Sequence, residues 1–450
     1  MNTKQLQKPN NIKFAGLYLM ILGLLFSCKS GQVNLFKPAS PHEQYQRKLV
    51  AAGLDKTSMG SAWIVSSLSV FQKALNINIP YQETGYFPAE SVSATAYRFN
   101  IVQGQKISIK LSRKGVQPFM IYIDIWEQAQ NGQMKLVAAA DTIDQSLQFE
   151  AKTSGSVFIR LQPELLRGGQ YTLNINTGPS LGFPVKSSNS RDIKSIFGDG
   201  RDENSRKHEG IDIFAAFRTP AVAAAGGTVT RVNENNLGGK VVWLRPKDKD
   251  YTLYYAHLDL QTAKEGQQVV QGDTLGLVGN TGNAKSTSSH LHFGIYTSGG
   301  AVDPLPFVNT VIKNPPVISS AVSNLNSTMR TRAAATLYAS TDQNARTITS
   351  LKSGTIVKVN SANSSWYKIE LPDGQPGFIQ AKALTSINKP LLKLKVTSAQ
   401  QELYDYPDSL HAAVKLTLKT GTQLEVLGNY NSYQLVKNNT DQTGWIDTLP

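Results

Sequence analysis

The chain has 450 residues, with 46 Lys and Arg against 32 Asp and Glu, a formal net charge of +14, and 40% hydrophobic residues. This composition excludes a disordered polyelectrolyte, a collagen-like repeat and a polytopic membrane protein, and the length suggests about three domains at roughly 100–200 residues each. The chain holds one cysteine. An intramolecular disulfide and a cysteine-rich metal site are therefore excluded, and any metal must be held by histidine and carboxylate side chains.

The first residues have the pattern of an export signal. Lysines and no acids precede residues 14–26, which are almost wholly apolar but too few to span a bilayer as a helix, which needs about 20 residues. A basic stretch followed by a short apolar one is typical of a secretory signal peptide. It runs into Leu25-Phe26-Ser27-Cys28, which resembles a bacterial lipobox. We expect residues 1–27 to be a lipoprotein signal peptide.

The same resemblance implies that Cys28 is lipidated and that its acyl chains anchor the protein stably to a membrane. The alternative is that Cys28 is an incidental thiol near a cleavage site. Lys29 follows the cysteine instead of Asp, so the usual signal for retention in the inner membrane of enteric bacteria is absent. This favours a lipoprotein of the cell envelope in the outer membrane, with the face of the membrane left open.

The next two segments differ in their hydrophobic period. Apolar residues recur at three- and four-residue spacing through residues 41–76, which predicts helices, so we assign residues 28–80 to a helical segment and tether. Later, apolar side chains alternate with a period of two on both sides of Gln103-Gly104, which predicts a β-hairpin there. About seven such strands predict a β-sandwich over residues 81–180, which resembles the pre-peptidase type found with secreted bacterial peptidases.

The C-terminal part contains an internal repeat. A first set of residues recurs at a constant offset of 67 residues: Gly354-Thr355, Val359, Trp366, Gly377 and Phe378-Ile379 return as Gly421-Thr422, Val426, Tyr433, Gly444 and Trp445-Ile446. Each unit resembles the bacterial SH3-like barrel that many cell-wall enzymes carry as a wall-binding appendage. We expect two such repeats at 329–388 and 389–450, after a linker at 313–328 that Pro315-Pro316 stiffen.

The residues that carry chemistry lie in the centre of the chain. His290 and His292 belong to a predicted strand, where residues two apart face the same side about 6.5–7 Å from each other, so both can address one site. Gly210 interrupts the stretch between His208 and Asp212, which excludes the helical His-Glu-x-x-His zinc motif. Both residues can still converge on a metal from a loop that leads into a strand. The alternative is a set of hydrogen-bonded core histidines.

Two imidazoles, one carboxylate and one open position form the ligand set of a catalytic zinc site. The run His208-x-Gly-x-Asp212, Tyr255-Ala-His257 and His290-Leu-His292-Phe resembles the LytM/lysostaphin-type zinc metallopeptidases over about residues 190–310. The resemblance implies a β-rich peptidase domain at 185–312, in which His208, Asp212 and His292 bind Zn²⁺. His257 and His290 would be the catalytic acid/base pair, and their individual roles stay open.

These predictions combine into one description. The fold class is mainly β and multidomain, with a short helical N-terminal segment, a β-sandwich, a lysostaphin-type peptidase domain and two small SH3-like barrels. The resemblance implies a zinc-dependent endopeptidase that hydrolyses the stem-peptide crosslinks of bacterial peptidoglycan and is anchored to the envelope by lipid. Two alternatives are a non-catalytic wall-binding activator of other peptidoglycan hydrolases and a zinc protease that acts on proteins.

Partners follow from the same description. We expect peptidoglycan stem peptides, a membrane through the lipid anchor, and a regulatory envelope protein as a further candidate. The sequence has no stripe of Arg and Lys with interleaved aromatic residues, so nucleic-acid binding is not expected. Whether the N-terminal sandwich inhibits the peptidase domain is left as a hypothesis.

Overall fold

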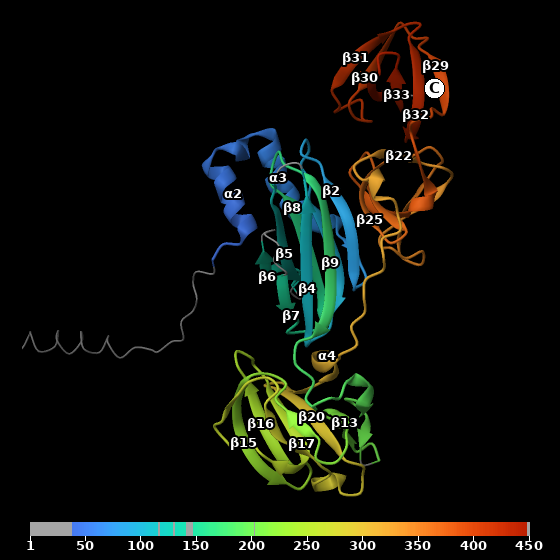
Figure 1. Cartoon of the computed structure of the whole chain (residues 1–450). Helices are drawn as coiled ribbons and strands as arrows, with labels where there is room; N and C mark the ends of the chain where they lie inside the picture. Colours follow the sequence, from blue (N-terminus) through green and yellow to red (C-terminus); the bar gives the residue numbers. More distant parts are fainter. Residues whose placement is uncertain (1–37, 116–117, 129–130, 141–146, 202, 448–450) are drawn as a thin grey trace, which may run out of the picture. The chain divides into compact units, whose positions relative to one another are not determined.

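The computed structural model describes residues 38–115, 118–128, 131–140, 147–201 and 203–447 (Figure 1). The predicted signal peptide and Cys28 lie outside these residues. Within them, no helix combines the length and the apolar character needed to cross a membrane. The expectation of a mainly β chain with a short helical N-terminal segment is confirmed.

The described chain begins with a helical segment. The segment comprises α2 (Pro41–Ala51), η2 (Leu54–Lys56), α3 (Ser58–Ser69) and η3 (Val70–Lys73). Thr57 caps α3, because its side chain accepts a hydrogen bond from the backbone N–H of Gly60. Trp63 on α3 is 1% exposed, and its indole N–H donates to the carbonyl of Pro163 at 2.8 Å. This contact holds the helical segment against the sheet that follows.

Two sheets with a shared apolar core follow the helices. One has the strand order β1-β3-β8-β5-β6, and β2, β9, β4 and β7 lie side by side in the other (Figure 1). Ile109, Ile159 and Leu173 are fully buried between them, as period-two patterns on two facing sheets require. The strands are β1 (Leu75–Asn76), β2 (Tyr81–Phe87), β3 (Thr95–Ile101), β4 (Gln105–Lys114), β5 (Ile121–Gln128), β6 (Met134–Ala140), β7 (Leu147–Glu150), β8 (Gly155–Pro163) and β9 (Gly169–Pro179).

The predicted hairpin around Gln103-Gly104 is wrong. The strands on either side of it, β3 and β4, both form, but β3 pairs with β8 and β4 pairs with β9 and β7. The short turn thus carries the chain from one sheet to the other. Alternation shows only that each strand has one buried face, and this holds for two strands of facing sheets as well as for two paired strands.

The second sheet continues into the first C-terminal repeat. Strand β2 pairs with β25 (Ile356–Asn363), with Thr84 opposite Ala362 and Gly85 opposite Ser361. Beside this pairing, Glu83 is fully buried and accepts hydrogen bonds from three tyrosine hydroxyls and from the hydroxyl of Ser361. The first repeat therefore shares a sheet and a buried polar network with the sandwich.

The central domain is built on another sheet, with the path β10-β13-β20-β17-β16-β15-β18. Strand β14 pairs with β19, β19 with β17, and β21 with β20. The elements are η4 (Ser190–Asp192), β10 (Ile193–Ser195), β11 (Gly200–Arg201), β12 (Arg206–Lys207), β13 (Ile211–Phe214), β14 (Pro220–Val222), β15 (Gly227–Asn235), β16 (Gly239–Pro246), β17 (Thr252–Gln261), β18 (Gln268–Val269), β19 (Thr274–Val278), η5 (Gly282–Ala284), β20 (His290–Thr297), β21 (Gly300–Val302) and α4 (Leu305–Val308).

Each C-terminal repeat has a glycine at the equivalent position, and each of these glycines packs closely against a leucine side chain. A Cβ added at Gly377 would lie 2.4 Å from the side chain of Leu337, and one added at Gly444 would lie 2.5 Å from that of Leu403. In each repeat, the glycine before an aromatic residue lets two strands approach closely. The elements are η6 (Val322–Asn324), β22 (Thr328–Thr331), β23 (Ala335–Tyr338), β24 (Thr347–Leu351), β25, β26 (Trp366–Glu370), β27 (Pro376–Gln380), η7 (Ala381–Ala383), β28 (Leu384–Ser386), β29 (Leu392–Lys395), β30 (Gln400–Tyr404), β31 (Val414–Lys419), β32 (Gln423–Tyr430), β33 (Tyr433–Asn438) and β34 (Thr443–Asp447).

Candidate metal centre

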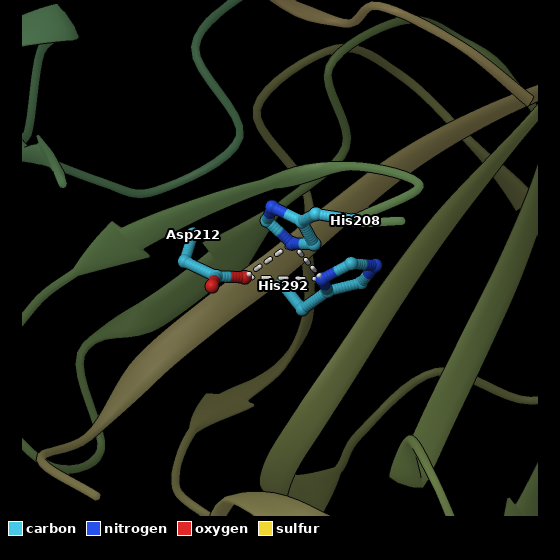
Figure 2. A group of neighbouring side chains, drawn as sticks. All are labelled: His208, Asp212 and His292. Atoms are coloured by element: carbon cyan, nitrogen blue, oxygen red, sulfur yellow. Dashed lines mark hydrogen bonds and ion pairs between the residues drawn. The ribbon is translucent and has the colours of Figure 1, made fainter. Parts of the chain in front are cut away.

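Three of the predicted site residues meet where two neighbouring strands of the central sheet lie beside the segment that precedes one of them. Strands β13 and β20 are antiparallel, and Asp212 stands directly opposite His292. His208 lies on the segment between β12 and β13. Because directly opposed residues point to the same face of a sheet, the register brings the carboxylate and the imidazole together. Figure 2 shows all three side chains converging on one point.

The three converging atoms form a nearly equilateral triangle. His208 Nε2 lies 3.0 Å from both Asp212 Oδ1 and His292 Nδ1, and His292 Nδ1 lies 3.0 Å from Asp212 Oδ1. On the other side of the ring, His208 Nδ1 lies 2.9 Å from the carbonyl oxygen of Ile196. A carbonyl only accepts, so in the neutral ring Nδ1 donates and Nε2 keeps its lone pair. That lone pair faces a carboxylate oxygen, an arrangement that a bound cation stabilises.

Asp212 is held as a carboxylate. Burial opposes its ionisation, but the interactions with the imidazoles of His208 and His292 outweigh burial and hold the pKa of Asp212 well below its usual value. Its second oxygen, Oδ2, accepts a hydrogen bond of 2.7 Å from the guanidinium of Arg201 on β11. The same guanidinium donates to the hydroxyl of Ser195 at 2.6 Å. Oδ2 is thus occupied while Oδ1 points to the two imidazoles.

Arg201 is a further residue of this site, and the sequence alone did not point to it. It is a positioning residue, since it orients the carboxylate that would bind the metal. An arginine eleven residues before Asp212 has no diagnostic spacing. Only the antiparallel pairing of β11 with β12 and of β10 with β13 brings it to the site.

The two predicted acid/base histidines lie beside the triangle. The ring centroids of His257 and His290 are 5.0 Å apart, and that of His257 is 5.8 Å from that of His292. His257 Nδ1 lies 2.8 Å from the carbonyl oxygen of Thr281, and His290 Nδ1 lies 2.8 Å from that of Ser288. In the neutral form of either ring Nδ1 would donate to that carbonyl, and Nε2 would be left as the proton acceptor. The two histidines are therefore equivalent in this respect.

His257 has two features of a functional residue. Burial, helped by the neighbouring His292 and His290, lowers its pKa to about 4, so the ring is neutral at physiological pH. Its φ of 60° lies in the left-handed region, which is unfavourable in free energy for any residue that has a side chain. The surrounding structure maintains this conformation, since the backbone N–H of His257 donates to the carbonyl of Gly238 at 2.7 Å.

All five side chains line one cleft of about 680 Å³. Tyr254, Trp243 and Tyr296 extend it to one side of His292. Every residue that lines the cleft falls between Lys194 and Tyr296. Among the residues that the structure describes, none from the sandwich or the repeats contributes to it.

Gly210 explains the middle of the motif between His208 and Asp212. A Cβ there would lie 2.5 Å from the carbonyl oxygen of Phe293 and 2.8 Å from Cε1 and Nε2 of His292. Ordinary contacts begin at about 3.4 Å. Only glycine leaves the His292 ring in place, so this position serves the metal centre sterically.

Comparison with known proteins places this cleft in a peptidase domain. Residues 206–304 match the family model of peptidase family M23, and residues 317–385 and 395–449 match that of the GW (Gly-Tryp) dipeptide domain. The chain thus carries an M23-type peptidase domain followed by GW domains. The expected internal repeat is confirmed by the second match.

Curated relatives match the same central region. An uncharacterized metalloprotease of Haemophilus influenzae is 41% identical over 22% of this chain and 21% of its own length. The peptidoglycan DD-endopeptidase ShyC of Vibrio cholerae is 35% identical over 21% of each chain. A lipoprotein NlpD/LppB homolog of Pseudomonas aeruginosa is 34% identical over 23% of this chain and 34% of its own. The chain spans less than half the length of these relatives.

Proposed function

We propose that this protein is a zinc-dependent endopeptidase that hydrolyses peptide crosslinks of bacterial peptidoglycan and is anchored to the cell envelope by lipid at Cys28. The observation that carries the proposal is the single cleft that joins a His-Asp-His triangle to two further histidines. The match to an M23-type domain supports it. So does the similarity to a relative named as a peptidoglycan endopeptidase.

The donor set fits zinc. Two imidazole nitrogens and one carboxylate oxygen are the protein ligands of many catalytic zinc sites, which keep the fourth position for water or substrate. Bonds of about 2.0–2.2 Å in a tetrahedral site place the donors about 3.3–3.6 Å apart, slightly more than the 3.0 Å spacing of the triangle. His208, Asp212 and His292 would hold the ion. When bound, it would polarise the scissile carbonyl and lower the pKa of a water molecule towards about 7.

The residues of the chain would perform the remaining steps. Nε2 of His257 or of His290 accepts the proton of the attacking water, because Nδ1 of each ring is already a donor to a backbone carbonyl. The protonated ring then donates to the leaving amine. The other imidazole hydrogen-bonds the oxygen that becomes negative in the transition state. Arg201 keeps Asp212 oriented throughout.

The flanking parts fit an enzyme that works on the wall. We assign wall binding to the two GW domains, which we take to be SH3-like. The similarity of the peptidase region to a relative named as a lipoprotein supports lipid anchoring and a cell-envelope location. Lys29, which follows Cys28 in place of Asp, points to the outer membrane.

Two alternatives make different predictions. A non-catalytic activator of other wall hydrolases would not need a complete metal centre, whereas all five site residues are present here. A zinc protease acting on proteins would share the whole centre, so substrate is what distinguishes it.

The experiment uses the chain from Ser30 and measures bound zinc together with digestion of purified sacculi and of denatured protein. We expect one zinc per chain and release of soluble fragments from sacculi alone. The variant His292→Ala should lose both zinc and digestion. Zinc binding without any digestion of sacculi would refute the proposal, and so would digestion of denatured protein in preference to sacculi.

A further inference from the structure

The sheet that carries the metal centre also carries an aromatic surface beside it. The ring centroid of Tyr254 on β17 lies 5.9 Å from that of His292 and 4.4 Å from that of Trp243 on β16. Tyr296 on β20 closes this group at 5.6 Å from Trp243. The register explains the group, since Trp243 stands opposite Tyr254 and Thr252 stands opposite Tyr296. The floor of the cleft therefore continues away from His292 along one face of the sheet.

A second hollow of about 510 Å³ begins where this aromatic floor ends. It shares Trp243 and Tyr296 with the metal-containing cleft, and at its far side it is lined by Arg231 on β15 and Arg245 on β16. Arg231 stands opposite Trp243 in the sheet. The two hollows thus adjoin at Trp243 and Tyr296, and together we call them the groove, with the candidate metal centre at one end and two arginines at the other.

Neither guanidinium is neutralised within the part of the chain that the structure describes. Arg245 donates only a long hydrogen bond of 3.5 Å to the hydroxyl of Thr252. Arg231 makes no ion pair with any described residue, and both side chains are exposed. Asp250 lines the same hollow without bonding either arginine. Two guanidinium groups without ion-pair partners lie at the end of the groove, and the planar donor arrangement of a guanidinium matches the two oxygens of a carboxylate.

The position of the arginines sets a distance from the reaction. On β17, Ala256 stands opposite His292. Thr252, four residues before Ala256 on the same strand, lies beside Arg245 on β16. Arg245 is therefore two strands across and four residues along from His292. Strands spaced about 4.8 Å apart and a rise of about 3.3 Å per residue give a separation of about 16 Å between the two Cα atoms. An extended peptide covers that distance in about five residues.

We infer that Arg231 and Arg245 form a subsite that binds a free carboxylate of the peptide substrate, several residues from the bond that is cut, while Trp243 and Tyr296 support the peptide between. The inference rests on the proposed function and deepens it. Stem peptides of peptidoglycan suit such a subsite because their acidic and diamino-acid residues carry free carboxylates. The subsite would make the enzyme prefer substrates whose carboxylates are not amidated.

The test compares a crosslinked stem-peptide dimer in its native form with the same dimer after amidation of its carboxylates. The proteins are the zinc-loaded chain from Ser30, the double variant Arg231→Gln/Arg245→Gln, and Arg191→Gln as a control. Arg191 is an exposed arginine of the same domain that lines neither hollow. We expect amidation to raise KM about tenfold in the unmodified protein and in the control, as the loss of a charge-assisted contact does at an exposed site.

In the double variant, KM for the native dimer should rise by a similar factor and should no longer depend on amidation, with kcat changed less than about twofold. A double variant that keeps the full preference for the native dimer would overturn the subsite. Equal KM values for both dimers in the unmodified protein would do the same, and would assign binding to the aromatic floor.

The outcome for the subsite can be separated from that for the proposed function. If the unmodified protein cuts neither dimer, the proposed function fails. Calorimetric binding of both dimers to the unmodified protein and to the double variant then decides the subsite. A preference for the native dimer that disappears in the double variant would support it, and no preference would refute it.

Discussion

Gly210→Ala should damage the metal centre without any change to a ligand. The added Cβ would lie 2.8 Å from Cε1 and Nε2 of His292 and 2.5 Å from the carbonyl oxygen of Phe293. To reach ordinary contact at about 3.4 Å, the ring must move by about 0.6 Å and the backbone by about 0.9 Å. The φ of Gly210 is not positive, so alanine brings no backbone strain and the effect is steric alone.

A displacement of this size exceeds the tolerance of about 0.5 Å within which a functional constellation must be held. We expect zinc affinity to fall about 10- to 100-fold and the free energy of unfolding to fall by about 1–3 kcal/mol, the usual cost of overpacking. Competition with a chromophoric chelator measures the first and denaturant unfolding the second.

The matched control is Gly299→Ala in the same domain. A Cβ there would meet only the hydroxyl of Thr297, at an ordinary 3.7 Å, so zinc affinity should stay unchanged. If Gly210→Ala binds zinc as tightly as this control, the steric argument is refuted.

Three further predictions concern single residues. His257→Gln should keep its zinc but lower kcat about 10²- to 10⁴-fold, and an active variant would assign proton transfer to His290 alone. Burial, with the charge of Arg160, lowers the pKa of His42 to about 4, so the unfolded state binds more protons between pH 4 and about 6.5. Stability should be fully present above about pH 6.5 and fall by about 3 kcal/mol as the pH drops to 4. In His42→Phe, the free energy of unfolding, measured with urea, should fall less between pH 6.5 and pH 4. The same dependence on pH as in the unmodified protein would contradict the assignment. The buried ammonium of Lys368 lies 3.9 Å from the carboxylate of Glu83. Glu83→Ala leaves this charge without its partner and should lower the free energy of unfolding by about 3–5 kcal/mol. A calorimetric Tm equal to that of the unmodified protein would show that the network is dispensable.

The sequence was most informative where a local pattern determines the outcome. The helical period of residues 41–76 gave α2 and α3, and the alternation around His290 and His292 gave a strand whose two histidines reach one cleft. The constant offset between Gly377 and Gly444 gave the repeat, because each glycine makes room for a leucine at the same contact.

The features that the sequence did not reveal depend on pairing between distant strands. A period of two says which face of a strand is buried and nothing about its partner, so the turn at Gln103-Gly104 was mistaken for a hairpin. The same reason hides the pairing of β2 with β25, in residues almost 280 apart in sequence. It also hides the approach of Arg201 to Asp212.

The groove shows a related limit. Trp243, Tyr254 and Tyr296 lie on three strands, and only the register places them on one face of the sheet beside His292. Their individual positions in the sequence are those of ordinary core aromatics. The three residues of the candidate metal centre could be proposed from the resemblance of their motifs to a known family, whereas the aromatic surface beside them could be seen only after the strands were paired.

The central claim is that a zinc-dependent reaction at this cleft cuts peptidoglycan crosslinks. The most direct test incubates the chain from Ser30 with purified sacculi and resolves the released muropeptides by mass, before and after chelation and again after zinc is restored. We predict that each crosslinked dimer is converted to two products whose masses add up to that of the dimer plus one water. Chelation should stop this conversion, and added zinc should restore it. Conversion that continues at the same rate in the chelated protein or in His292→Ala would contradict the account.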